Sequence, residues 1–252
     1  MEWFLDNSGM VFGLAGQHLV LAVIPMLLGL LISIPLAQLA RRNSTLRSVV
    51  ATATSLLYTI PSLALFIILP TILGTRILDP LNVVVALTIY AVALLVRAAM
   101  DAFDSVDDDL RSAAVAMGFK PLARFFQVDL PLSLPVLFAG LRVVSVSNIS
   151  LVSVAALLGV GNLGILFTDG LQRTFVTEVV VGIVAILILA LVMDAVLVVL
   201  ERLLTPWTRA AGSGSDRRDG TALLTEPKSG PGHPQASAVP PSAARPDPGV
   251  SA

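Results

Sequence analysis

The feature that most constrains this fold is a series of long stretches without a single Asp, Glu, Lys or Arg. Five such stretches cover residues 7–40, 48–75, 80–96, 143–168 and 179–193. A helix needs about 20 apolar residues to cross the hydrocarbon core of a bilayer. Their apolar character is continuous, whereas strands of a membrane barrel alternate about every second residue. The sequence therefore predicts an all-α protein embedded in lipid.

The composition supports the same class, because charged residues make up 13% of the chain and hydrophobic residues 56%. A soluble domain carries about 25% charged residues, enough to cover a surface in contact with water. We therefore expect a multi-pass membrane protein that contacts lipid over much of its surface. Its five transmembrane helices are expected near residues 15–39, 49–73, 81–103, 133–157 and 177–201.

The distribution of Lys and Arg among the loops predicts the orientation, because cytoplasmic loops carry the excess of cations. Ten cations fall on one side: Arg41, Arg42, Arg47, Arg111, Lys120, Arg124, Arg202, Arg209, Arg217 and Arg218. The other side has only Arg76 and Arg173. We expect the N-terminus outside and the C-terminus in the cytoplasm. No cation precedes Arg41, so the start lacks the basic region of a cleaved signal peptide, and the first helix is expected to be retained.

Three regions follow from these features. Residues 1–14 are expected to form an extracytoplasmic segment, and residues 15–209 a transmembrane domain with a long cytoplasmic loop at 104–131. Residues 210–252 are expected to be a disordered cytoplasmic tail. Seven Pro and six Gly among the 42 residues from 211 to 252, without a period, are typical of disordered chain.

Several function classes are disfavoured. The formal net charge of −1 gives no basic surface for nucleic acid. The chain has no cysteine, and its two histidines, His18 and His233, fall in a membrane segment and the tail, so neither a metal site nor thiol catalysis is expected. No Ser/His/Asp set or paired carboxylates are placed as in an active site. No phosphate-binding G-x-x-x-x-G-K-[ST] loop occurs, so we expect no enzyme and no cofactor in this chain.

The loop at 104–131 is too long for a simple connector and has helical signals of its own. Ser105 followed by Asp108 matches a capping box, which predicts the start of a helix. Gly118 suits the left-handed residue that ends a helix, and Pro121 suits the first turn of the next. Pro131 is expected to stop that second helix. The sequence predicts a short helix–turn–helix that projects from the membrane.

The spacing within this loop resembles the EAA loop of ABC importer permeases, which reads E-A-A, three residues, G, nine residues, I-x-L-P. The matching residues are Ser112, Ala113, Ala114, Gly118, Val128, Leu130 and Pro131. Ser112 stands where the family has glutamate, and Val128 replaces isoleucine. The resemblance implies that these residues couple the chain to a separate ABC ATP-binding subunit, which binds ATP and Mg²⁺. An amphipathic helix on the membrane surface is the alternative interpretation of the loop.

The resemblance covers roughly residues 16–208 and implies the MetI-like fold of type I ABC importers, in a bacterial cell membrane. The run Tyr58-Thr59-Ile60-Pro61-Ser62-Leu63-Ala64-Leu65 is similar to permeases for osmoprotectants such as glycine betaine, carnitine and choline. It implies import driven by ATP hydrolysed in the partner, with an extracytoplasmic substrate-binding protein and a second permease copy or a sister permease. A permease for an amino acid or another small solute is the alternative. An ATP-independent channel or secondary transporter is a remoter one.

A second glycine pattern, Gly159-Val160-Gly161-Asn162-Leu163-Gly164, matches the dinucleotide fingerprint G-x-G-x-x-G. That fingerprint requires a preceding strand and a βαβ unit, whereas this run follows a membrane helix. We expect a glycine-rich turn before a short helix on the outer face.

Three ionisable residues, Arg97, Arg142 and Asp194, interrupt the expected spans, and such residues normally face protein or water. Arg97 is expected to pair with Asp101 or to extend to the interface. Arg142 and Asp194 have similar depths, so we predict that they pair. Their role is either packing and gating or direct contact with substrate.

Tyr58 and Tyr90 offer ring faces to a quaternary ammonium ion, or else line a helix interface. Pro61 and Ser62 follow Tyr58 at a point where a proline interrupts the helix. These four residues, with Arg142 and Asp194, are the candidates for a substrate pathway or a gate.

Overall fold

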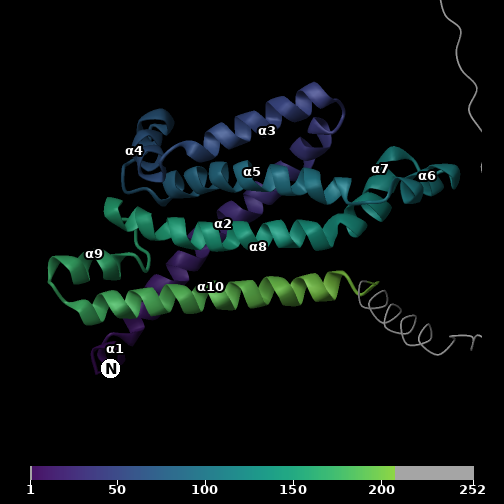
Figure 1. Cartoon of the computed structure of the whole chain (residues 1–252). Coiled ribbons are helices and arrows are strands. Elements are labelled where there is room, and N and C mark those ends of the chain that lie inside the picture. Colours follow the sequence, from purple (N-terminus) through teal and green to yellow (C-terminus); the bar gives the residue numbers. More distant parts are fainter. Residues whose placement is uncertain (1, 208–252) are drawn as a thin grey trace, which may run out of the picture. The chain divides into compact units, whose positions relative to one another are not determined.

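The computed structural model describes residues 2–207, and within that range every regular element is helical (Figure 1). The α-helices are α1 (Glu2–Asp6), α2 (Ser8–Ala40), α3 (Ser44–Thr59), α4 (Ser62–Leu73), α5 (Pro80–Asp104), α6 (Asp108–Ala116), α7 (Pro121–Arg124), α8 (Leu130–Val154), α9 (Ile165–Gln172) and α10 (Val176–Leu204). A π-helical turn, Phe125–Asp129, joins α7 to α8, and a 3₁₀ turn, Ala155–Leu158, follows α8. The all-α class is confirmed. The tail expected at 210–252 lies outside the described residues.

Four helical segments in the described range are long and apolar enough to cross a membrane. They are Ser8–Ala40, Pro80–Asp104, Pro121–Leu158 and Val176–Leu204. The pair α3 and α4 passes the same test when taken together, which brings the number to five. The expected number of spans thus holds if this pair is one crossing.

The second span is not the continuous helix expected over 49–73. α3 and α4 meet at an angle of 98°, with the break at Ile60 and Pro61. Ile60 has ψ 128°, an extended conformation, because the ring of a proline disfavours helical backbone at the residue before it. Pro61 also lacks the N–H that would continue the α3 hydrogen bonds.

The first long helix begins earlier than expected, at Ser8 rather than near residue 15. It has 33 residues, so at 1.5 Å per residue it is about 50 Å long. The hydrocarbon core is only about 30 Å thick. α2 therefore either tilts or extends beyond the core. Residues 8–14 are part of this helix, and the extracytoplasmic location of residues 1–14 stays a prediction.

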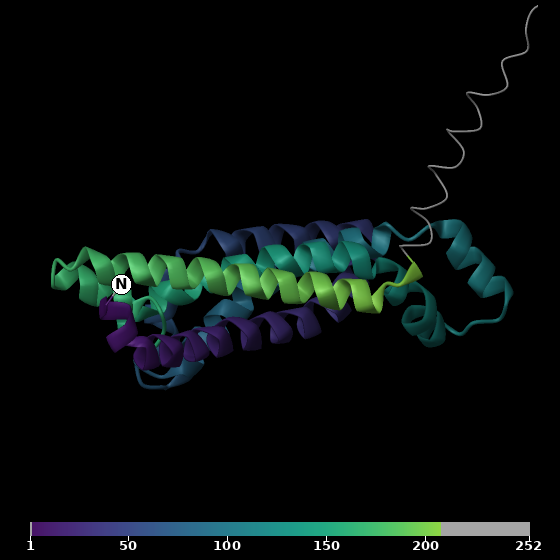
Figure 2. The same cartoon turned by 90° about the horizontal axis from the view of Figure 1, so that it is seen from below.

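α5 is the centre of the bundle, with α2, α3, α4 and α8 packed around it. Figures 1 and 2 both show α5 and α8 side by side, while α2 crosses them obliquely in Figure 1. Glycines allow two of these crossings. A Cβ on Gly29 of α2 would lie 2.5 Å from the Cβ of Ala91, and one on Gly140 of α8 would lie 2.5 Å from the Cβ of Ala98. Small residues at both crossings let the backbones approach closely.

The bundle has two distinct ends. At one end α6 and α7 project beyond the long helices, and we call it the α6 end (Figures 1 and 2). Asp104 at this end forms ion pairs with Arg41 at 2.8 Å and Arg47 at 2.5 Å, which tie the α2–α3 connection to the end of α5. α9 lies at the opposite end, the α9 end.

Candidate functional site

The loop between α5 and α8 begins with a different cap from the one expected. Asp107 is the N-cap of α6, and its carboxylate accepts a hydrogen bond from the Asp109 N–H at 2.8 Å. Ser105 instead follows the last residue of α5, where its hydroxyl donates to the Ala102 carbonyl. The capping box predicted for Ser105 and Asp108 is therefore wrong, because α5 continues to Asp104 and uses Ser105 to close its own last turn.

The turn after α6 has the predicted geometry. Gly118 has φ +83°, in the left-handed region, and the Phe119 N–H donates to the Ala114 carbonyl across the turn. Pro121 is the first residue of α7, as predicted. Pro131 does not stop a helix, because α7 runs through the π-helical turn into α8 and places Pro131 in the first turn of α8. Pro131 has no N–H to continue the helical hydrogen bonds, and it directly follows the π-helical turn, in which the Leu130 N–H donates to the Phe125 carbonyl.

A buried ion cluster holds α6 against the start of α8. The Asp129 side chain is 6% exposed and accepts hydrogen bonds from Arg111 Nε at 2.9 Å and Arg124 Nε at 3.3 Å. Arg111 also donates to Asp108 at 2.8 Å and to the Phe103 carbonyl. Burial alone would lower the pKa of Arg111, but the hydrogen bonds to Asp129 and Asp108 raise it above its usual value. Sequence reasoning missed this cluster, because Asp129 fills the unspecified position of the I-x-L-P motif.

The motif residues divide between the inside and the outside of this loop. Ala114 is buried, while Ser112, Ala113 and Gly118 are exposed, and Val128, Leu130 and Pro131 are half-buried. Around them lies an exposed apolar surface of five large side chains, which we call the loop surface: Leu110, Val115, Met117, Leu122 and Phe126. Several large apolar side chains exposed on one short loop favour an interaction site.

Arg142 and Asp194 pair as predicted. Arg142 Nε donates to Asp194 Oδ1 at 2.6 Å and Nη2 to Oδ2 at 2.8 Å, a bidentate contact between α8 and α10. Both side chains remain partly exposed, at 41% and 32%. The pair thus lies at the surface of the bundle between two long helices.

The two tyrosines lie together at the bend between α3 and α4. Their rings contact edge to face, with centroids 5.9 Å apart. Tyr90 is buried and its hydroxyl donates to the Ile60 carbonyl at 2.5 Å, which satisfies a carbonyl that the break leaves free. Tyr58 is 45% exposed, and Pro61 begins the break with Ser62 as the first residue of α4. Of the two rings, only that of Tyr58 is open to a ligand.

Arg97 does not pair with Asp101 in the described structure. Its Nη2 donates instead to the Ser55 hydroxyl at 2.7 Å and to the Ala51 carbonyl at 3.3 Å, both on α3. Arg97, Ser55, Thr54 and Tyr58 line a cavity of about 200 Å³ on the α3–α5 surface. Thus a cavity that is lined by an arginine and by hydroxyl-bearing residues of α3 lies within the membrane-length part of the bundle, with Ala93 and Leu94 as apolar lining.

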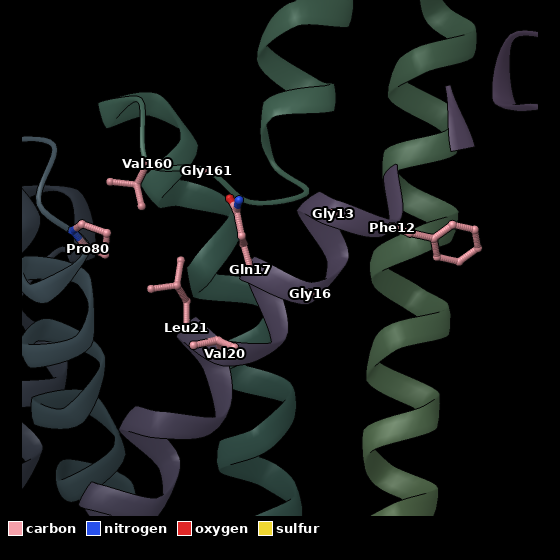
Figure 3. Close-up of a pocket in the computed structure, with 9 residues that line it drawn as sticks. All are labelled: Phe12, Gly13, Gly16, Gln17, Val20, Leu21, Pro80, Val160 and Gly161. Atoms are coloured by element: carbon pink, nitrogen blue, oxygen red, sulfur yellow. The ribbon is translucent and has the colours of Figure 1, made fainter. Parts of the chain in front are cut away.

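The glycine-rich run 159–164 forms the predicted turn before a short helix. Gly159 has φ +81°, and α9 begins at Ile165. Beside the turn is a mostly apolar cavity of about 580 Å³ (Figure 3). In Figure 3 the Gln17 side chain points from α2 toward Gly161. Thus the turn, α2 and Pro80 of α5 line an open cavity at the α9 end.

The described residues hold no group of three or more His, Cys, Asp or Glu side chains that could bind a metal ion. His18 is buried, and its Nε2 lies 2.9 Å from the Ile149 carbonyl. His18 therefore links α2 to α8 and is part of the packing.

A bundle of membrane-length helices with a folded loop that projects at one end defines an integral membrane protein. The sequence matches the family described as "Binding-protein-dependent transport system inner membrane component" over residues 26–210. The chain belongs to this family, and it is a transport subunit of the inner membrane rather than an enzyme.

Individual relatives agree with this assignment. The chain is 35% identical to the osmoprotectant import permease protein OsmW of Salmonella typhimurium, over 82% of this chain and 97% of that protein. It is 29% identical to the choline transport system permease protein OpuBB of Bacillus subtilis, over 82% of this chain and 94% of that protein. The fold matches a structure titled as an inward-facing conformation of the MetNI methionine ABC transporter, with a TM-score of 0.70 at 21% identity, covering 79% of this chain and 98% of that chain. The MetI-like permease fold is confirmed.

Proposed function

We propose that this chain is the permease subunit of an ATP-driven importer of osmoprotectants such as glycine betaine, carnitine or choline. The observation that carries the proposal is the similarity to OsmW, which spans 97% of that protein's length at 35% identity. The similarity to OpuBB, named for choline, points to the same class of quaternary ammonium solutes.

The ATP-binding subunit docks on the loop surface around α6. Three observations support this: the motif spacing from Ala113 to Pro131, the exposed apolar side chains of the loop surface, and the Arg111–Asp129 contact that fixes α6 to α8. Through that contact a displacement of α6 is transmitted to the start of a long helix. ATP and Mg²⁺ belong to the partner. Ser112 replaces the family's glutamate, so the contact to the partner at this position uses a hydroxyl.

The α6 end lies in the cytoplasm and the α9 end outside. The cations of the α2–α3 and α5–α8 connections all lie at the α6 end, in agreement with the positive-inside rule. The extracytoplasmic binding protein then meets the α9 end, near the turn of Gly159–Gly164. A second permease, either an identical copy or a sister chain, completes the pathway.

The gate involves the bend between α3 and α4, where Tyr58, Pro61 and Ser62 lie. A movement of either helix about this bend would widen or narrow the solute pathway. The Arg142–Asp194 pair holds α8 to α10 and acts as a latch between them. Tyr90 fixes the bend by its hydrogen bond to the Ile60 carbonyl.

The test is ATP-dependent uptake of labelled glycine betaine in cells that lack their own osmolyte importers. The chain is co-expressed with its ATP-binding subunit and binding protein, and excess choline, carnitine, proline or methionine is added in turn. Uptake that the quaternary amines compete supports the proposal. ATP-dependent uptake competed only by methionine would refute the solute class, and uptake that ignores ATP would refute the importer.

A further inference from the structure

Arg97 is an unpaired cation on a membrane-length helix. It lies 17 residues after Pro80 and seven before Asp104 in α5, so at 1.5 Å per residue it is about 10 Å from the α6 end of that helix. The Arg97 side chain is exposed on the surface of the chain. Among the described residues, no carboxylate lies within ion-pair distance of it, whereas Arg142 has its own carboxylate partner. Arg97 therefore has no counter-ion among the described residues.

An arginine side chain that extended to the membrane interface would point toward the α6 end, but the guanidinium of Arg97 does not. α3 and α5 run antiparallel: Tyr90 contacts Tyr58 and Ile60, and seven residues later Arg97 contacts Ala51 and Ser55. The 2.7 Å contact is to Ser55, which is about 6 Å further along α3 from the α6 end than Ala51. Helical side chains lean toward the N-terminus of their helix, which for α5 is the opposite end. The charge is thus held in the interior of the membrane-length region.

A charge in that position faces protein or water rather than lipid, because burial in hydrocarbon is costly. Thr54, Ser55 and Tyr58 bring polar groups to the cavity beside Arg97, and Ala93 and Leu94 supply apolar lining. Exposed parts of α10 are apolar, as at Leu187 and Leu191. The charge and hydroxyl groups make the cavity beside Arg97, rather than the α10 surface, the place for water.

The cavity beside Arg97 has room for a small solute, since its volume is about 200 Å³. Nη2 of Arg97 donates to Ser55 and Ala51, and both edges of a guanidinium that make two parallel hydrogen bonds include Nη2. The Nε and Nη1 N–H groups remain to donate single charge-assisted hydrogen bonds to a carboxylate. The exposed Tyr58 ring, which lines the same cavity, attracts a quaternary ammonium group.

We propose that Arg97, Ser55 and Tyr58 form a solute site in the translocation pathway, in which Arg97 binds the carboxylate of a zwitterionic solute and the Tyr58 ring contacts its ammonium group. This inference rests on the proposed function for its solute class. The access of water to the site and the preference of the site for anions do not depend on that function, and they are tested separately.

The first test uses the fact that the chain has no cysteine. Ser55→Cys places one thiol beside Arg97, and its reaction is measured with two methanethiosulfonate reagents, one carrying a sulfonate and one a trimethylammonium group. The assembled transporter is used, with any partner cysteines removed. Adding Arg97→Gln should lower the sulfonate-to-ammonium rate ratio by about tenfold, because a neighbouring charge attracts one reagent and repels the other. Arg42→Gln, which removes an exposed arginine at the α6 end, should leave the ratio unchanged. No reaction at Ser55→Cys, or an unchanged ratio with Arg97→Gln, would overturn the site.

The second test compares solutes with and without a carboxylate. Arg97→Gln should reduce glycine betaine uptake at least tenfold while choline uptake, measured in the same vesicles, changes less than threefold. Equal loss of both would mean that Arg97 has a structural role and would overturn the solute assignment. If the wild-type transporter takes up neither solute, both the proposed function and the solute assignment fail. The ratio of the two reagent rates then still decides whether an anion site exists.

Discussion

Gly29 provides the sharpest test of how the bundle packs. The change Gly29→Ala adds one methyl group where α2 crosses α5, and the new Cβ would lie 2.5 Å from the Cβ of Ala91 and 3.3 Å from the Ala91 carbonyl carbon. Carbon atoms in favourable contact are about 3.5–4.0 Å apart. The two helices must therefore separate by about 1 Å, or the backbone must bend. Because the obstacle is a Cβ and backbone atoms, no rotamer change relieves the contact.

Overpacking of this kind costs about 1–3 kcal/mol. We expect Gly29→Ala to lower the thermal unfolding midpoint of the purified transporter in detergent. The reciprocal pair, Gly29→Ala with Ala91→Gly, moves the methyl group from α5 to α2 and should recover most of the loss. Gly13→Ala on the same helix has nothing within 4 Å of the new Cβ and should be neutral or slightly stabilising, since alanine favours a helix over glycine by up to about 1 kcal/mol. A Gly29→Ala midpoint equal to that of Gly13→Ala, or a pair no better than Gly29→Ala alone, would refute the close crossing.

Three further predictions concern the ion pairs and the loop turn. Arg142→Asp and Asp194→Arg should each abolish uptake by leaving like charges together, while the two changes combined should restore it; a combined variant as inactive as the single ones would contradict the latch. Gly118→Val should destabilise the left-handed turn by about 1–2 kcal/mol and uncouple ATP hydrolysis from uptake, whereas Gly118→Asn should retain coupling, since asparagine tolerates that conformation. Equal behaviour of the two variants in a coupled ATPase and uptake assay would contradict the role of the turn. Asp129→Ala should destabilise the loop by about 1–3 kcal/mol, because it removes the carboxylate that accepts a hydrogen bond from Arg111. The variant should be cleaved faster by protease between α5 and α8, and unchanged cleavage would contradict the role of the Arg111–Asp129 contact.

The membrane-length helices could be predicted closely because lipid imposes a simple rule: a crossing segment must contain almost no charge. Asp194 and Arg142 could be paired for the same reason, since two opposite charges at one depth each need a partner. The break at Pro61 could not be predicted from proline alone. Pro25 and Pro35 lie inside α2 without ending it, so a proline is not sufficient for a break. At Ile60 the Tyr90 hydroxyl also satisfies the carbonyl that the break leaves free.

The loop was predicted in part. The left-handed turn at Gly118 and the start of α7 at Pro121 depend on local backbone chemistry, which the sequence contains. The continuation of α7 into α8 and the contact of Arg111 with Asp129 depend on how the loop folds back on the long helices. The direction of Arg97 toward Ser55 likewise depends on the packing of α3 against α5, which no spacing rule reveals.

The most direct test of the central claim is uptake of labelled glycine betaine into vesicles that contain the purified transporter, with ATP supplied to the α6 end and the binding protein to the α9 end. We expect uptake that requires both and that is lost in Gly118→Val while the ATP-binding subunit still hydrolyses ATP. Equal uptake by the wild type and Gly118→Val, or uptake without ATP, would contradict the account of a loop-coupled importer.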